Sequence, residues 1–156
     1  MSNAVQSLSV LHNNPFILGP LFSSFYGLIG GKPQSILLSY LILPIVLYPA
    51  SQRFLLNAIS TSSVMSMAGK SNKRDRLYGL DERIAEYHEL TNISFQYAVD
   101  MEVIRIAENL SVDVVSLWPS DTLCLLDHLK AAKRLGILFQ PFDVPTIYRM
   151  LGVKKI

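Results

Sequence analysis

The sequence predicts a mostly α-helical single domain with one small β-hairpin, an α+β fold. The 156 residues are about the length of one domain. Apolar side chains recur at helical spacing over most of the chain. Two runs rich in β-branched residues, VIRIAEN at 103–109 and SVDVVSLW at 111–118, alternate in part and meet near Asn109. Such a pair of short runs is typical of a hairpin.

Charged side chains are scarce in the first third of the chain. Among the first 52 residues, Lys32 is the single Asp, Glu, Lys or Arg. Over the whole chain 17% of residues are charged, whereas a soluble domain typically has about 25%. Helices that are apolar on nearly all sides are usually buried. Because a chain of this length has limited surface of its own to cover them, the composition favours a permanent protein partner.

The longest nearly continuous apolar run, ILLSYLILPIVLY at 36–48, is short for a membrane span. It has 13 residues, whereas a spanning helix needs about 20. Pro44 also interrupts it. We therefore expect buried helices and no membrane, and keep a small membrane-associated protein as an alternative. The single cysteine, Cys124, and the absence of Lys or Arg from the first ten residues favour a cytoplasmic protein.

Residues 13–60 form the predicted apolar helical part. A first helix is expected over 15–29, where apolar residues recur at helical spacing and two glycines follow. Pro33 begins a second helix, which Pro44 should break or kink. A short amphipathic helix then resumes near Ala50.

Residues 61–77 form the predicted connecting loop. The segment is rich in small and polar side chains and ends in a charge cluster. The cluster indicates either a solvated linker or a contact with phosphate, and Asp75 dilutes its positive charge. Its basic members are Lys70, Lys73, Arg74 and Arg76.

Residues 78–156 form the predicted winged-helix-like part. A helix begins at Leu80, and Thr91 or Asn92 caps a second one. The hairpin and a further helix follow. Helix, helix, hairpin, helix is the outline of a winged-helix module, an analogy of fold that by itself licenses no function.

Two helices follow the hairpin. The first is expected to be capped by Ser120 or Asp121 and to end at Gly136 or continue to Phe139. The second is a short helix over 144–151, which the next glycine ends. The whole chain, 1–156, is thus interpreted as one domain.

The sequence offers no recognisable catalytic, cofactor-binding or metal-binding set. Gly-Gly-Lys at 30–32 lacks the upstream glycine of a phosphate loop, and Pro33 replaces its Ser or Thr. No two histidines have metal-ligand spacing. We therefore predict a protein that is not an enzyme and has no cofactor. The side chains weighed were His12, His88, His128 and Cys124.

Four motifs in fixed order resemble a known family. They are the Asn-Pro that opens the aromatic-rich helix at 14–26, LLSYLILPIVLYPASQRFLL at 37–56, ELTNISFQYAV at 89–99, and AAKRLGILF with DVPTIYRMLGVK within 131–154. Together they resemble the middle component of bacterial three-component ABC (SMC-like ATPase) systems. That class includes the small subunit of Lamassu antiphage defence.

The resemblance implies a non-catalytic adaptor. Its partners would be an SMC-like coiled-coil ATPase and an effector, often a nuclease. The adaptor would link the two and restrain the effector until foreign DNA is sensed. DNA would be reached through the complex rather than by this chain alone.

The two apolar helices are the expected partner interface, although their apolar faces can equally form the core. The residues predicted for that interface are Phe16, Leu21, Phe22, Phe25, Tyr26, Tyr40 and Pro44.

A winged-helix DNA-binding transcriptional regulator is the alternative function. The helix from Asn92 would then enter the groove of a duplex. Residues 92–101 contain no Lys or Arg, which is unusual for a helix that reads DNA. Salt-dependent binding of the isolated protein to a duplex would favour this alternative.

Overall fold

The computed structural model describes residues 14–69, 76–118 and 125–156. The described part is mostly helical, with a two-stranded antiparallel hairpin, which confirms the predicted fold class. In chain order the elements are α2 (Pro15–Tyr26), the 3-10 helix η1 (Ser35–Leu38), α3 (Ser39–Val46), α4 (Pro49–Leu56), α5 (Val64–Ala68), α6 (Leu80–Asp100), β1 (Ile104–Ile106), β2 (Val112–Val114), α7 (Leu126–Phe139) and α8 (Val144–Leu151).

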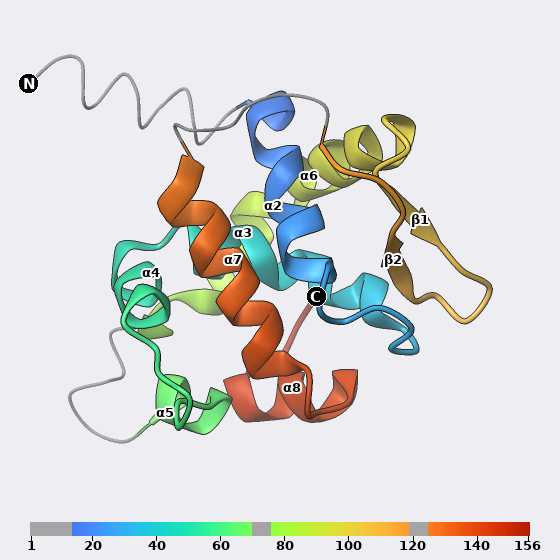
Figure 1. The fold of residues 1–156 in the computed structure, drawn as a ribbon. Helices are drawn as coiled ribbons and strands as arrows, with labels where there is room; N and C mark the ends of the chain where they lie inside the picture. Colours follow the sequence, from blue (N-terminus) through green and yellow to red (C-terminus); the bar gives the residue numbers. More distant parts are fainter. Residues whose placement is uncertain (1–13, 70–75, 119–124) are drawn as a thin grey trace, which may run out of the picture.

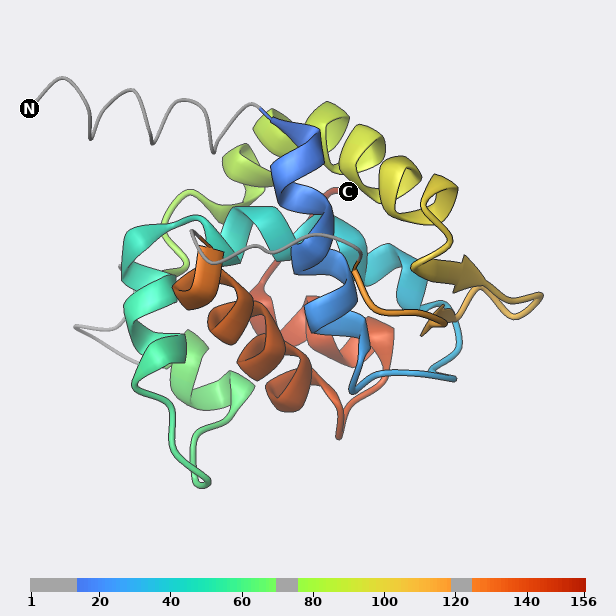
Figure 2. The same ribbon diagram turned by 45° about the horizontal axis from the view of Figure 1, so that its top comes forward.

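Helix α2 lies at the centre of the molecule. It packs against α6, α7 and α3, and α3 in turn contacts both α6 and α7 (Figures 1 and 2). From Leu18 to Tyr26 the apolar side chains of α2 are buried, and its aromatic rings meet those of neighbouring helices edge to face. Phe22 contacts Phe95 of α6 and Phe25 contacts Phe139 of α7, with ring centroids 5.9 Å apart in both pairs. These contacts join the two halves of the sequence in one core.

The break predicted at Pro44 lies slightly later in the chain, after Val46. Helix α3 runs through Pro44, and the chain turns after Val46, so that 35–46 and 49–56 are bent by 99°. The residue before a proline avoids the helical conformation. Tyr48 precedes Pro49 and is extended, so Pro49 and not Pro44 sets the break. Pro44 is held by packing, because α3 is buried along most of its length.

Among the described helices, no single one is long and apolar enough to cross a membrane. The bent pair made of 35–46 and 49–56 meets the length and composition criteria only when its two pieces are combined.

The expected loop contains a helix. Ser63 begins α5 with a capping box, in which its side chain and that of Ser66 each bind the other residue's backbone N–H. Of the basic cluster, Lys70, Lys73 and Arg74 lie outside the described residues. Arg76 is packed, with its guanidinium carbon 4.2 Å from the centroid of the Phe54 ring.

The predicted helix boundary at Thr91 and Asn92 is wrong. Residues 80–100 form one continuous helix, α6. Thr91 and Ser94 are buried on the face that packs against the core. Their side chains therefore contribute to packing and do not cap a new helix. Between residue 78 and the hairpin the structure therefore has one helix, α6, where a winged helix has two.

The predicted hairpin is confirmed, and hydrogen bonds join it to the helical core. Ile104 lies opposite Val114 in the antiparallel register. The Ser35 hydroxyl oxygen accepts a hydrogen bond from the Val112 N–H at 3.0 Å, and the Ser35 carbonyl accepts one from the Tyr26 hydroxyl at 2.8 Å. One buried serine thus joins α2, η1 and β2.

The last two helices follow the sequence closely. Helix α7 continues past Gly136 to Phe139. The caps proposed at Ser120 and Asp121, and Cys124, lie outside the described residues. Helix α8 is capped by Asp143, whose Oδ1 accepts the Thr146 N–H at 2.9 Å, and it ends at Gly152 in the left-handed conformation, as predicted.

Among the described residues, four basic side chains donate to carbonyl groups at or just beyond the C-terminal ends of helices. Carbonyl groups there lack helical partners and carry the negative end of the helix dipole, so a cation stabilises them. The four donors are Arg83 to the Pro44 carbonyl of α3, Arg134 to the Leu55 and Leu56 carbonyls of α4, Arg76 to the Ser66 carbonyl of α5, and Lys32 to the Gln140 and Phe142 carbonyls after α7.

Candidate partner interface

The structure separates the seven predicted interface residues into two groups. Five are buried in the core of this chain: Leu21, Phe22, Phe25, Tyr26 and Pro44. The other two keep exposed surface. Phe16 is 64% exposed, and Tyr40 is half-buried. Of the seven predicted residues, Phe16 and Tyr40 are therefore the two that a partner could reach without a change in the fold.

Phe16 belongs to a larger apolar surface on α6. Its ring packs edge to face on Tyr97, with centroids 4.9 Å apart, and Tyr97 contacts Trp118 at 5.6 Å. Ile93 lies one turn before Tyr97 on α6, and Met101, the C-cap residue of α6, lies one turn after it. Both are exposed. We call this surface the α6 strip. Its members are Phe16, Ile93, Tyr97, Met101, Leu117 and Trp118.

The α6 strip has the composition of a protein interface. Isolated exposed apolar residues are ordinary. Here the Tyr97 ring contacts both Phe16 and Trp118, and exposed aliphatic side chains lie nearby. Leu117 is 92% exposed and Ile93 48%. Tyr and Trp are enriched where interfaces are strongest. Phe16, Tyr97 and Trp118 therefore provide the anchors that such a contact uses.

The rings of the strip rest on a rigid support. A Cβ atom on Gly19 would lie 2.5 Å from Cη2 of Trp118, so the indole lies directly over the backbone of α2. Glycine is the one residue that leaves room for this approach. Through Trp118 the strip is consequently fixed to α2, which packs against α3, α6 and α7.

The border of the α6 strip is acidic. No Lys or Arg occurs between Arg83 and Arg105. The carboxylates of that interval, all exposed, are those of Glu86, Glu89, Asp100 and Glu102. Negative charge at this density repels the phosphates of nucleic acid and attracts a basic surface.

Tyr40 takes part in a separate polar cluster, on the side of α6 that faces α3. Its ring stacks on His88 with centroids 4.8 Å apart. Its hydroxyl donates to Oδ1 of Asn92 at 2.9 Å. Tyr40 is thus engaged within the chain, and Phe16 is the predicted interface residue that the structure places in an extended apolar surface.

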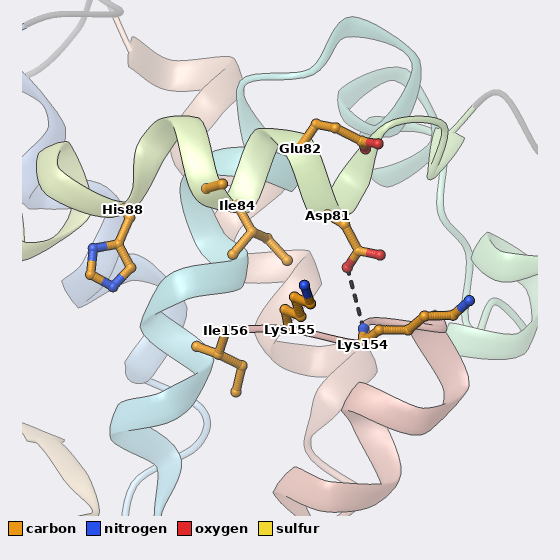
Figure 3. A pocket seen from close by; sticks show the side chains of 8 residues that line it. Asp81, Glu82, Ile84, His88, Lys154, Lys155 and Ile156 are labelled. Carbon is orange, nitrogen blue, oxygen red and sulfur yellow. Dashed lines mark hydrogen bonds between the residues drawn. The ribbon is translucent and has the colours of Figure 1, made fainter.

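A pocket of about 680 Å³ lies between the start of α6 and residues 154–156. Figure 3 shows Asp81 facing this segment, where its carboxylate accepts the Lys154 N–H at 3.3 Å. The pocket combines carboxylates of α6 with the charges of Lys154 and Lys155 over apolar walls that include Ile84. Within the described ranges no group of three or more metal-ligating side chains assembles.

A protein-family profile described as ABC-three component (ABC-3C) system Middle Component 3 matches residues 2–155. The chain belongs to this family. The match spans the apolar helices and the hairpin part alike, and it confirms the prediction of a middle component of a three-component ABC system. No curated protein and no solved structure matches the chain.

Most of the α6 strip in this Middle Component 3 protein was absent from the predicted interface. The missed residues are Ile93, Tyr97, Met101, Leu117 and Trp118. Ile93, Tyr97 and Met101 recur every fourth residue, while Phe95 and Ala98 are buried on another face of the same helix. The sequence signal that indicates such a surface is a helix with apolar residues on two faces, of which only one can be buried in the core.

Proposed function

We propose that this Middle Component 3 protein is a non-catalytic adaptor of a bacterial antiphage and anti-plasmid complex. It links an SMC-like coiled-coil ATPase to an effector, of which a nuclease is the expected kind, in the cytoplasm. It restrains the effector until foreign DNA is sensed. The Lamassu system, whose small subunit the chain resembles, is the type of complex meant.

One observation carries the proposal: a contiguous, aromatic-rich surface stays exposed on a chain that works with other components. Membership of the family supplies the other components. The α6 strip supplies a place for one of them, because Tyr97 contacts both Phe16 and Trp118 and all three remain at least partly open to solvent.

The acidic border supports contact with DNA through the complex rather than through α6. Lys and Arg supply most of the electrostatic attraction to phosphate, and the interval from 84 to 104 has neither. We expect the isolated chain not to bind a duplex at about 50 mM salt, a condition that strengthens phosphate contacts. Binding that weakens as salt rises would favour the regulator alternative.

The experiment is co-expression of the tagged chain with the two other components of its own system. Size-exclusion chromatography with light scattering should give one complex of fixed ratio that contains all three. Removal of this chain should separate the ATPase from the effector and release effector activity without foreign DNA. An ATPase and effector that associate equally well without the chain would contradict the adaptor function.

A further inference from the structure

We propose that the α6 strip binds an amphipathic helix of a partner protein whose apolar stripe is flanked by Lys and Arg. The inference rests on the proposed function, since the partner is another component of the same system. It adds the surface, the form of the bound segment and the sign of its charge.

The form of the bound segment follows from the ridge on α6. Ile93, Tyr97 and Met101 are four residues apart, so they form one continuous row on the helix surface. Such a row fits the groove between equivalent rows of a second helix. The distance from the first to the last is about 12 Å at 1.5 Å per residue, or roughly two turns of the facing helix.

Side chains of two neighbouring elements widen this row into a binding surface. Phe16 borders Tyr97 on the α2 side at 4.9 Å between centroids, and Trp118 contacts the same ring from the segment after β2. Leu117, next to Trp118, is almost fully exposed. Apolar side chains from three segments therefore converge around Tyr97.

The charge of the bound segment follows from the border of the strip. Glu86 and Glu89 lie near one end of the row, and Asp100 and Glu102 near the other, without an intervening Lys or Arg. Asp100 also accepts a hydrogen bond from Gln96 at 2.8 Å, which holds its carboxylate at the surface. Basic residues on both sides of the partner's stripe would meet these carboxylates.

The same charges argue against the two occupants that this chain itself could provide. A second copy of the strip would set carboxylates against carboxylates, which opposes association. Residues 1–13 contain no Lys or Arg, so they do not complement the border. A basic helix of another protein is the occupant that satisfies both the apolar row and its border.

The first test uses two designed 18-residue helical peptides with one Leu and Ile stripe. One peptide carries Lys and Arg beside the stripe, and the other carries Glu. Titration calorimetry and the emission of Trp118, the one tryptophan, report binding to the full-length chain. The basic peptide should bind at least tenfold more tightly. Equal affinities would overturn the predicted charge of the partner.

The second test uses substitutions at exposed positions. Ile93→Asp and Glu89→Lys should each lower the affinity for the basic peptide at least tenfold. The matched controls are Ile59→Asp, in the segment after α4, and Glu108→Lys, beyond β1, both at exposed positions outside the strip. Circular dichroism and thermal unfolding of every variant verify the fold. If the strip variants and the controls bind the basic peptide with equal affinity, the α6 strip is not its binding site.

The third test separates this inference from the adaptor function. The double variant Ile93→Asp with Glu89→Lys is co-expressed with the two other components. Loss of one component from the complex, with the double control intact, supports the inference. A complete complex with the double variant overturns the inference and leaves the adaptor function standing. If the wild-type chain forms no complex, the adaptor function is overturned. The peptide tests then show whether the α6 strip binds a basic amphipathic helix.

Discussion

The backbone carbonyl oxygen of Phe25 lies 2.5 Å from the point that a Cβ atom on Gly136 would occupy. Helices α2 and α7 therefore meet backbone to backbone, at a distance that only glycine permits. This contact sets the position of the central helix against the second half of the chain. Because Phe16 is carried by the same helix, the geometry of the α6 strip depends on it.

Gly136→Ala should destabilise the protein although alanine is the better helix former. The gain in helix propensity is up to about 1 kcal/mol. The added methyl group meets a backbone atom, which moves only with the whole helix, and overpacking of this kind costs about 1–3 kcal/mol. We expect a net loss in the free energy of unfolding measured by urea. Gly27→Ala is the control, because its Cβ would lie 3.4 Å from the Ser23 carbonyl oxygen. If Gly136→Ala were as stable as Gly27→Ala, the close crossing would be unimportant.

Lys32, the single Asp, Glu, Lys or Arg among the first 52 residues, has a structural role. Its Nζ donates to the Gln140 carbonyl at 3.0 Å and to the Phe142 carbonyl, at the C-terminal end of α7. Burial lowers the pKa of its ammonium group. Lys32→Met should lower the free energy of unfolding by about 1–2 kcal/mol, as expected for lost charge-assisted hydrogen bonds. Lys130→Met, at an exposed position of α7, should change it little. Equal effects of the two would contradict the capping role.

Sequence patterns located most of the elements, and proline chemistry explains one of the errors. Helix α8 and the hairpin carry their own signals, a cap with a terminal glycine and alternating β-branched residues. Pro44 and Pro49 carry the same local signal but have different outcomes. Packing keeps Pro44 within α3, whereas the extended Tyr48 allows Pro49 to begin α4. Tertiary packing of this kind cannot be deduced from local spacing.

The candidate site was predictable only in part, for a related reason. Hydrophobicity tells which side chains leave water, but not which surface covers them. Phe16 and Phe25 lie on one helix and are both aromatic, yet one is 64% exposed and the other fully buried. Only the packing of α6 and α7 around α2 separates them. The outward row at Ile93 and Tyr97 was hidden for the same reason, since α6 has apolar residues on two faces.

Tyr26 should make the protein sensitive to alkali. Burial raises the pKa of its phenol well above the ordinary value of 10.0. Above pH 10 the tyrosine ionises in the unfolded chain and stays protonated in the folded one. The stabilisation is therefore complete below about pH 10 and falls by about 1.36 kcal/mol per pH unit above it. Burial also raises the pKa of Tyr148 and Tyr87, which adds to the slope in the same direction.

Tyr26→Phe separates the two contributions of this hydroxyl. At pH 7 the variant should be less stable by about 1–3 kcal/mol, because the buried Ser35 carbonyl loses its donor. Above pH 10 the free energy of unfolding of the variant should fall less steeply with pH than that of the wild type. The difference between the two slopes should be about 1.36 kcal/mol per pH unit. Urea unfolding at several pH values measures both quantities. Identical slopes would show that Tyr26 ionises in the folded protein.

Gly19→Ala should move Trp118 with little loss of stability. The added Cβ would lie 2.5 Å from Cη2 of the indole, the same distance as at Gly136. Here the obstacle is a partly exposed side chain, which can rotate away, whereas at Gly136 it is backbone. The cost should therefore stay below about 1 kcal/mol, under the range for a rigid overpacked site.

Fluorescence reads this movement directly, because Trp118 is the one tryptophan of the chain. Its emission should shift to longer wavelength in Gly19→Ala as the ring gains contact with water, and should not shift in Gly27→Ala. Displacement of the ring also disturbs its contact with Tyr97, so Gly19→Ala should weaken the binding of a basic amphipathic peptide. An unchanged emission spectrum would mean that the indole does not rest on α2, and the rigid support assigned to the α6 strip would be wrong.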